Sequence, residues 1–217
     1  ARGSGAHTIM ILDNDGNHVY FDRMDGQGYQ NIVTAEFKAR TALLGRAPSK
    51  NVQNLLARDP TQEMHTYQVG FYPVGGGLPI VVNKQLIGVM GVGGYPPNPP
   101  VWDDEICGHT ALVEVFGPSV PPLPEVSQTN RNPNPNPNPN PLLVPRFGAA
   151  APPKSTLPAE FVVGGSGAAN VFDANQISLA AAKKIASVCR TWEASKGGTM
   201  AAYILNNAGE LVHMERM

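Results

Sequence analysis

The first half of the chain alternates between two hydrophobic periodicities, one typical of strands and one typical of helices. Short apolar runs lie between turn residues, whereas longer segments carry apolar residues at every third or fourth position. The strand-like segments are residues 8–12, 18–21, 78–82 and 85–92, and the helical segments are residues 32–43, 51–58 and 103–116. The first two strand-like segments flank a polar turn and predict a β-hairpin. A mixed α/β (α+β) domain is therefore predicted for residues 1–116.

Prolines separate this domain from the rest of the chain. Thirteen of the 21 prolines lie between Pro118 and Pro158, and Asn alternates with Pro from Asn132 to Pro141. Because proline fixes φ and lacks an amide hydrogen, this stretch can form neither a helix nor a central strand. Residues 117–170 are therefore predicted to be a long extended linker. Disorder and packing along a neighbour's surface are the alternatives.

Residues 171–217 repeat the start of the domain, with a helix in front. Ser178 can cap a helix whose apolar residues recur at spacings of four, three and four. The residues predicted to mediate assembly are Ile177, Ala181, Ile185, Val188 and Trp192. The hairpin that follows matches residues 7–24 at a constant offset of 193. The identical pairs are Ile11/Ile204, Leu12/Leu205, Asn14/Asn207, Gly16/Gly209, Val19/Val212, Arg23/Arg216 and Met24/Met217.

Each copy of the repeat lacks what the other has. The second copy has a helix before its hairpin, and the first copy has further strands and helices after its hairpin. A helix with an apolar stripe has to bury that stripe. We therefore expect the helix at 178–195 to dock on the sheet of the first copy, in its own chain or in a neighbouring chain. Docking between chains would be head-to-tail and would form rings or filaments.

Several motifs resemble the GlcG/HbpS-like haem-binding family, whose domain also ends some corrinoid adenosyltransferases. The matching segments are residues 13–26, 38–42 with Pro48 and Ser49, 76–94, 103–104, 178–186 and 206–217. The resemblance implies a profilin-like antiparallel sheet flanked by helices, commonly packed into homo-oligomers. It also implies haem or another tetrapyrrole as ligand, with haem degradation in some members. The rotated order of elements and the proline-rich insertion depart from the family pattern and favour an assembly role.

Composition and motif searches narrow the function further. A formal charge of −1 and a pI near 6.6 lack the basic character that nucleic-acid binding requires. No apolar run reaches the roughly 18 residues of a membrane-spanning helix. No nucleophile elbow, phosphate-binding loop or pair of histidines at metal spacing is present, so no catalytic or metal-binding residue is predicted. The acidic residues at 103–105 are assigned to the dipole of their helix. We expect an exported protein, extracellular or periplasmic, that is not an enzyme.

Candidate haem ligands cluster near the middle of the first domain. A haem site needs an apolar surface and a side chain able to bind iron. Met64, His65 and Tyr67 form the richest local group of such side chains. His65 is the candidate axial ligand, and an exposed loop histidine is the alternative interpretation.

Other candidate residues would contact the propionates at the edge of the haem or the flat face of its ring. Arg23 and Arg40 can pair with a propionate in bidentate fashion. The alternative for both is an internal ion pair with Asp22, Asp25 or Glu36. Gly76 and Gly77 could let a flat ligand approach the backbone, although tight turns explain them equally well.

Three functional hypotheses follow from the sequence. The first is an assembly subunit that exchanges its C-terminal helix and hairpin with a neighbour to build an oligomer or filament. The second is a haem-binding protein for storage, uptake or sensing that folds within one chain. The third is a haem-degrading enzyme.

Overall fold

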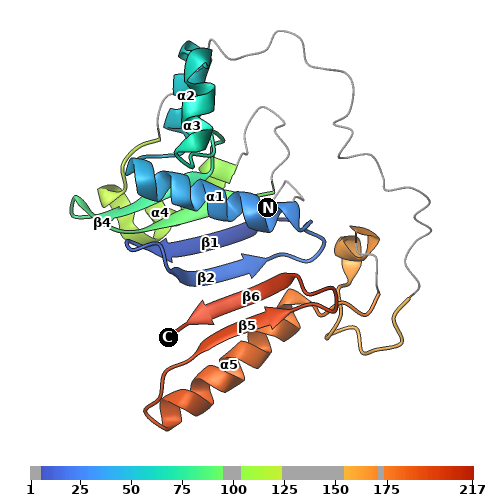
Figure 1. The fold of residues 1–217 in the computed structure, drawn as a ribbon. Helices are drawn as coiled ribbons and strands as arrows, with labels where there is room; N and C mark the ends of the chain where they lie inside the picture. The colour runs from blue at the N-terminus through green and yellow to red at the C-terminus, as the bar shows by residue number, and fades with distance from the viewer. Residues whose placement is uncertain (1–5, 95–103, 124–153, 171–173) are drawn as a thin grey trace.

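The fold is a six-stranded antiparallel sheet with helices on both faces (Figure 1). The structure is a computed structural model and describes residues 6–94, 104–123, 154–170 and 174–217. The strands are β1 (Thr8–Asp13), β2 (His18–Arg23), β3 (Gly77–Val82), β4 (Gln85–Gly93), β5 (Ala201–Leu205) and β6 (Leu211–Arg216). The helices are α1 (Gln30–Gly45), α2 (Lys50–Arg58), α3 (Glu63–Gln68), α4 (Asp104–Phe116) and α5 (Leu179–Ser195), with 3-10 turns at Pro60–Gln62, Gly117–Ser119 and Gly165–Asn170. The predicted α/β class is confirmed, and the strands follow the order β3-β4-β1-β2-β6-β5.

Helix α1 covers one face of the sheet at close range. Ala35, Ala39 and Ala42 are fully buried on this helix and belong, with Ile32, to the cluster that contains Met10, Leu12 and Phe21. A Cβ on Gly91 of β4 would lie 1.8 Å from the carbonyl oxygen of Ala35 in α1. Glycine is therefore required in β4 because the helix backbone occupies the space of a side chain.

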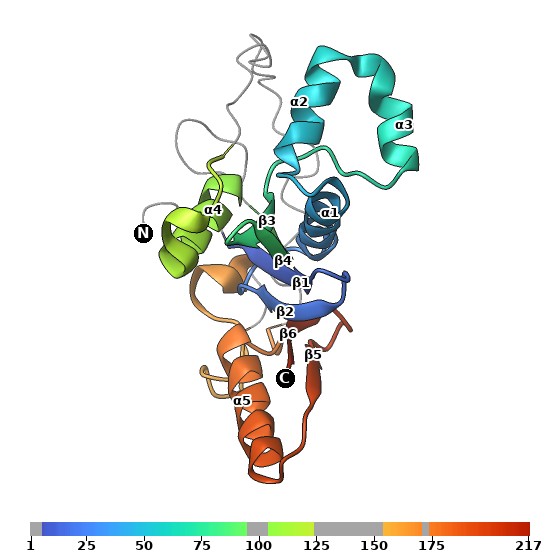
Figure 2. The same cartoon turned by 90° about the vertical axis from the view of Figure 1, so that its left-hand side faces the viewer.

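The opposite face carries α4 and α5. Leu112 of α4 packs on a second apolar cluster made by β3 and β4, to which Ile9 and Ile11 of β1 also contribute. Figure 2 shows α4 and α5 on one side of the sheet and α1 on the other. None of the described helices combines the length and apolar character needed to cross a bilayer.

Strands β2 and β6 join the two copies of the repeat into one sheet. Phe21 lies opposite Met214, its counterpart at the offset of 193, and Asp22 lies opposite His213, the counterpart of Tyr20. The pairing is therefore symmetrical about Phe21 and Met214, as if a two-fold axis passed through the sheet between them. Both of these side chains are buried in the cluster beneath α1. The C-terminal hairpin thus extends the sheet of the first copy and shares its core.

Helix α5 does not bury the predicted apolar stripe. It packs on β6 through Ala182 and Ala186, which are 0% and 1% exposed. Ile185, Val188 and Trp192, which we call the α5 stripe, are 49%, 63% and 60% exposed. The expectation that this stripe docks on the sheet is wrong for the folded chain, because small alanine side chains bring the helix closer to the strand than the larger residues would.

The predicted linker is described only in part. Residues 124–153, which include the Asn-Pro alternation, lie outside the described residues. In the C-terminal part of the predicted linker, Val162 is buried and pairs with Ile177 in an isolated antiparallel bridge. Residues 161–163 therefore pair with the segment that leads into α5. Ala181, in the first turn of α5, is partly buried.

Candidate functional site

Helix α1 presents apolar side chains to solvent beside a protruding pair of helices. Figure 1 shows α2 and α3 rising from the α1 side of the sheet. Phe37 and Leu44 of α1 are exposed, as are Met64 and Tyr67 of α3. A set of exposed or partly exposed side chains of α1, of α3 and of the loop between α3 and β3 is called the α1–α3 surface, which consists of Phe37, Arg40, Leu44, Met64, His65, Tyr67 and Tyr72.

The loop after α3 is anchored to α1. The amide of Tyr72 donates to Oγ1 of the buried Thr41 at 2.7 Å, and the rings of Tyr72 and Phe37 have centroids 6.0 Å apart. Phe71 lies against Gly45 at the end of α1. Burial raises the pKa of Tyr72, and the neighbouring Tyr67 raises it further. These contacts attach the loop that follows α3 to the outer side of α1.

The predicted haem ligands occupy α3 itself. Met64, His65 and Tyr67 are all exposed on this helix. The alternative interpretation described His65 as an exposed loop histidine. The residue is exposed, but it lies in a helix and not in a loop. Periodicity missed α3 because six residues make fewer than two helical turns. The structure thus groups these three residues on one short element of the α1–α3 surface.

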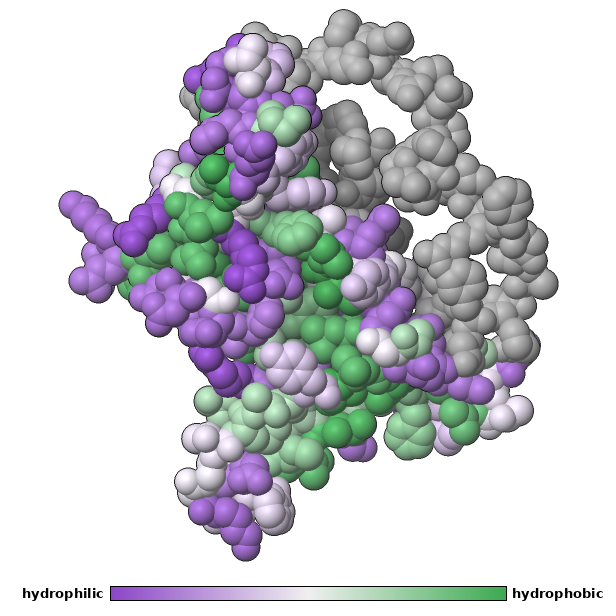
Figure 3. Space-filling view, viewed as in Figure 1, coloured by the Kyte–Doolittle hydropathy of each residue, from purple (hydrophilic) through white to green (hydrophobic). Residues whose placement is uncertain are grey.

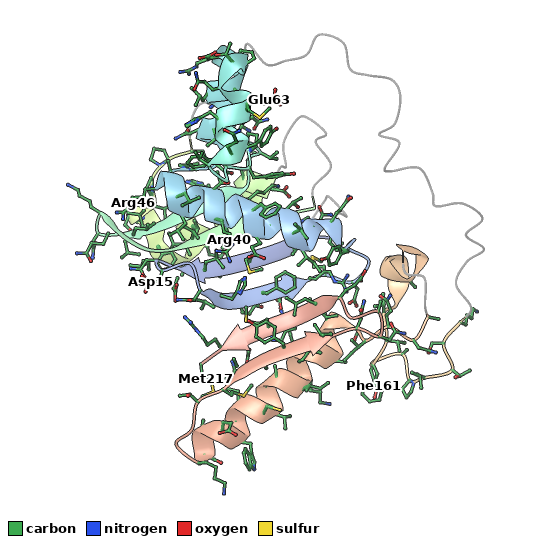
Figure 4. The ribbon with its side chains drawn as sticks, in the orientation of Figure 1. Asp15, Arg40, Arg46, Glu63, Phe161 and Met217 are labelled. Carbon is green, nitrogen blue, oxygen red and sulfur yellow. The ribbon has the colours of Figure 1, made fainter. Side chains whose placement is uncertain are left out.

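Arg40 lies on the same surface, one turn after Glu36. Its Nε and Nη2 atoms lie 2.9 and 2.8 Å from Oε1 of Glu36, as the ion-pair interpretation predicted. His18 Nε2 lies 3.4 Å from the same oxygen. Figure 4 shows Arg40 on α1. Because a guanidinium has five N–H donors and this one is partly exposed, Arg40 can also bind a ligand carboxylate.

Arg23 lies elsewhere and has a different partner from those predicted. It is buried, and its Nη1 lies 2.8 Å from Oε2 of Glu210 and 3.3 Å from the carbonyl oxygen of Gln27. Glu210 belongs to the second copy of the repeat, so the pair ties the two copies together. A pairing between residues this far apart in sequence has no local signal.

Gly76 and Gly77 are packed against protein rather than against open space. A Cβ on Gly77 would lie 2.0 Å from the carbonyl oxygen of Lys38, and one on Gly76 would lie 2.7 Å from the Cβ of Asp104. Gly76 also has a φ of 112°, which favours glycine. The close approach that these glycines permit is to α1 and α4.

A buried ion-pair cluster beside these glycines was not predicted. Lys38 Nζ lies 2.6 Å from Oδ2 of Asp104 and donates to the carbonyl oxygen of Val92 at 3.0 Å. Glu105 is buried as well and lies 3.5 Å from Lys50. The acidic start of α4 therefore pairs with lysines in addition to any effect of the helix dipole. The available signal was the position of Lys38 on the helical face that otherwise carries alanines.

A second buried polar group lies where the repeat copies meet. His213 of β6 is 1% exposed, and its Nδ1 lies 2.7 Å from Oδ1 of Asp22. Its Nε2 lies 3.5 Å from Glu215. Lys183 and Arg190 of α5 form ion pairs with Asp22 and Glu215 respectively. These contacts fix the orientation of α5 on the joined sheet.

Comparisons with known proteins point to one family. A family model described as haem degrading protein HbpS-like matches residues 3–112, which include the whole α1–α3 surface. Protein GlcG of Escherichia coli (strain K12) is 31% identical over 85 residues, which are 39% of this chain and 62% of GlcG. This chain therefore spans less than two thirds of that relative.

A search of solved structures found further similarities. HbpS is 28% identical with a TM-score of 0.43, over 52% of this chain and 74% of that one. Klebsiella pneumoniae protein ORFY is 23% identical with a TM-score of 0.44, over 53% and 77%. A PduOC:heme complex is 18% identical with a TM-score of 0.41, over 54% and 79%.

Proposed function

The chain belongs to the HbpS-like family, and on that basis we propose that it binds haem on the α1–α3 surface. The observation that carries the proposal is that, within the family-matched residues, exposed iron-binding and aromatic side chains on α3 are linked through the loop after α3 to exposed apolar and cationic side chains on α1. Met64, His65 and Tyr67 come from α3, and Arg40 comes from α1.

The chemistry of these residues fits haem. Phe37, Leu44 and Tyr67 offer apolar contact to a macrocycle, His65 offers an imidazole to an axial position, and Arg40 offers donors to a propionate. When bound, haem would supply an iron centre with a coordination position for such a ligand. The contribution of this chain is to bind the ring on its apolar surface and to orient its carboxylates.

Haem titration of the full chain tests the proposal. We expect a Soret band that saturates with haem and that weakens or shifts in His65→Ala. His109→Ala is the matched control, because His109 lies on α4 and contacts the carbonyl oxygen of Pro121. Arg40→Gln is expected to weaken affinity about two- to fivefold, the scale of an exposed ion pair.

The possible outcomes test haem binding, the role of His65 and haem degradation separately. Absence of a saturable band would refute haem binding, and an unchanged band in His65→Ala would remove His65 as the ligand. Consumption of bound haem in the presence of a reductant and oxygen would extend the function to haem degradation. Export remains a prediction, which fractionation of the source cells can test.

We propose, as a second function, that the C-terminal segment can complete the sheet of a neighbouring chain. The symmetrical pairing of β2 with β6 supports this, because such an edge-to-edge contact serves equally well within and between chains. The Arg23–Glu210 and Asp13–Arg216 ion pairs would form across the same contact. Exchange of this kind would build the predicted oligomer or filament.

A cysteine pair across β2 and β6 distinguishes the two arrangements. Tyr20 lies opposite Glu215, so Tyr20→Cys with Glu215→Cys can be oxidised to a disulfide in a background with Cys107 and Cys189 replaced by serine. Exchange predicts a covalent ladder above the mass of one chain on a non-reducing gel. A cross-link formed only within single chains would refute exchange.

A further inference from the structure

We infer that the end of the molecule formed by β5 and α5 is a self-association surface, on which a second copy of this chain docks by antiparallel β5–β5 pairing. Among the described strands, β3 and β5 are the two edges of the sheet. Natural edge strands are commonly protected by proline, charge or irregular register. Both edge strands have a register shift, but β3 also contains Pro79, whereas β5 (Ala201–Leu205) has no proline and no charged residue. β5 is therefore the less protected edge.

The repeat shows that the counterpart of β5 is covered on both sides. That counterpart is β1, which pairs with β2 and with β4. Met10 and Leu12 of β1 are 1% and 0% exposed, but their counterparts Tyr203 and Leu205 are 57% and 52% exposed. Figure 3 shows hydrophobic side chains over β5 and β6 on the face toward the viewer. Strand β5 of the second copy is therefore exposed, whereas its counterpart β1 in the first copy is buried.

The α5 stripe lies at the same end of the molecule. Lys183 and Arg190 are seven residues apart, so they project from one side of α5, and they contact Asp22 of β2 and Glu215 of β6. At 100° per residue the α5 stripe projects from the opposite side of the helix axis. Because β5 lies on the other side of β6 from β2, the stripe points toward the free edge of β5.

The elements present in one chain restrict which strand of a second copy can pair with β5. Each chain has a single β3–β4 hairpin with its α1, and its own β1 already pairs with that hairpin. Within the part of the chain that the structure describes, a second copy therefore has no spare unit of this kind, and the sheet edges that it offers are β3 and β5. Since β3 is protected, we assign the contact to β5 of both copies.

The geometry of this contact also accounts for the exposed stripe. A two-fold axis perpendicular to the sheet keeps the faces of the two sheets continuous, as the pairing of β2 with β6 already does within one chain. The two α5 helices would then lie side by side on one face, with their α5 stripes toward each other. On the other face, Tyr203 and Leu205 would meet their equivalents across the strands. The docking would bury the apolar residues left exposed at this end.

Mass measurements on the full chain test the inference. In chains closed by the cross-link between positions 20 and 215, in which exchange cannot occur, we expect light scattering and sedimentation to give two chains at micromolar concentrations. Val188→Lys, Trp192→Lys and Tyr203→Lys each place a charge on the contact at an exposed position, so circular dichroism should stay unchanged while the dimer weakens at least tenfold. Ser187→Lys is the matched control, because it adds the same charge to an exposed position on the side of α5 that carries Lys183, away from the α5 stripe.

Three results would overturn the inference. These are a single-chain mass for the chain closed by the cross-link between positions 20 and 215, a dimer that the lysine variants leave intact, and a mass of the closed chain that grows steadily with concentration, which would indicate head-to-tail joining of β3 and β5. The haem titration and the cross-link between positions 20 and 215 can be repeated in the monomeric variants. Failure of this inference is therefore distinguishable from failure of the proposed functions.

Discussion

Replacing Met214 with alanine tests whether the C-terminal strand belongs to the core of the first copy. Met214 is 1% exposed and packs beneath α1 opposite Phe21. Met217 is three residues further along the chain and is 44% exposed. The two substitutions remove the same atoms, so their difference isolates the contribution of burial.

The expected cost follows from that burial. Truncating a buried methionine to alanine costs about 2–5 kcal/mol of unfolding free energy, because apolar contact is lost and a cavity remains. For a chain of this size each kcal/mol lowers Tm by about 2–4 °C, so Met214→Ala should lower Tm by about 4–20 °C. Met217→Ala should stay within about 0.5 kcal/mol of the unmodified protein.

Two probes in one urea titration show which part of the chain loses stability. Far-ultraviolet circular dichroism reports on the whole chain, and fluorescence of Trp192 in a Trp102→Phe background reports on α5. If the sheet is one cooperative unit, Met214→Ala moves both transitions together. A shift of the Trp192 transition alone would show that residues 174–217 unfold separately. Equal stability of the Met214 and Met217 variants would also refute the shared core.

Three further predictions concern the ion pairs and the close approach of α1. Arg216 bonds to Asp13 and, as the largest cause, holds the pKa of that carboxyl at about 2, below its ordinary 3.8, so Arg216→Gln should raise this pKa in a nuclear magnetic resonance titration. Because the folded pKa is the lower one, the stabilisation is present above about pH 3.8 and is lost as the pH falls toward 2; an unchanged titration would exclude the pair as the cause. Asp104→Asn leaves the ammonium of Lys38 buried without its carboxylate and should cost about 3–5 kcal/mol in urea unfolding, whereas an apolar replacement of both residues should cost much less. Gly91→Ala puts a Cβ against an α1 carbonyl and should destabilise the fold by about 1–3 kcal/mol or more, and a neutral result would show that α1 can move away.

The sequence predicted the regular elements because their causes are local. Alternating or helically spaced apolar residues, a capping serine at 178 and turn residues between strands mark where an element begins and ends. The main strands and helices lie where these patterns predicted them. Helix α3 was missed because a six-residue helix shows too little periodicity to distinguish it from a loop.

The candidate site was only partly predictable. Met64, His65 and Tyr67 are neighbours in sequence, so their grouping could be seen without coordinates. The position of α3 relative to α1 depends on contacts between the loop after α3 and helix α1, which no local pattern encodes. The partner of Arg23 was missed for the same reason, since Glu210 is distant in sequence.

By itself, the sequence determined the types of element, the existence of two related hairpins and the family to which the first of them belongs. The tertiary structure alone decided how these hairpins join and which side of α5 faces the sheet. A periodic pattern shows that an apolar stripe exists, but burial depends on which side chains let two backbones come closest. In α5 the small side chains of Ala182 and Ala186 allowed that approach, and the larger residues of the α5 stripe remained exposed.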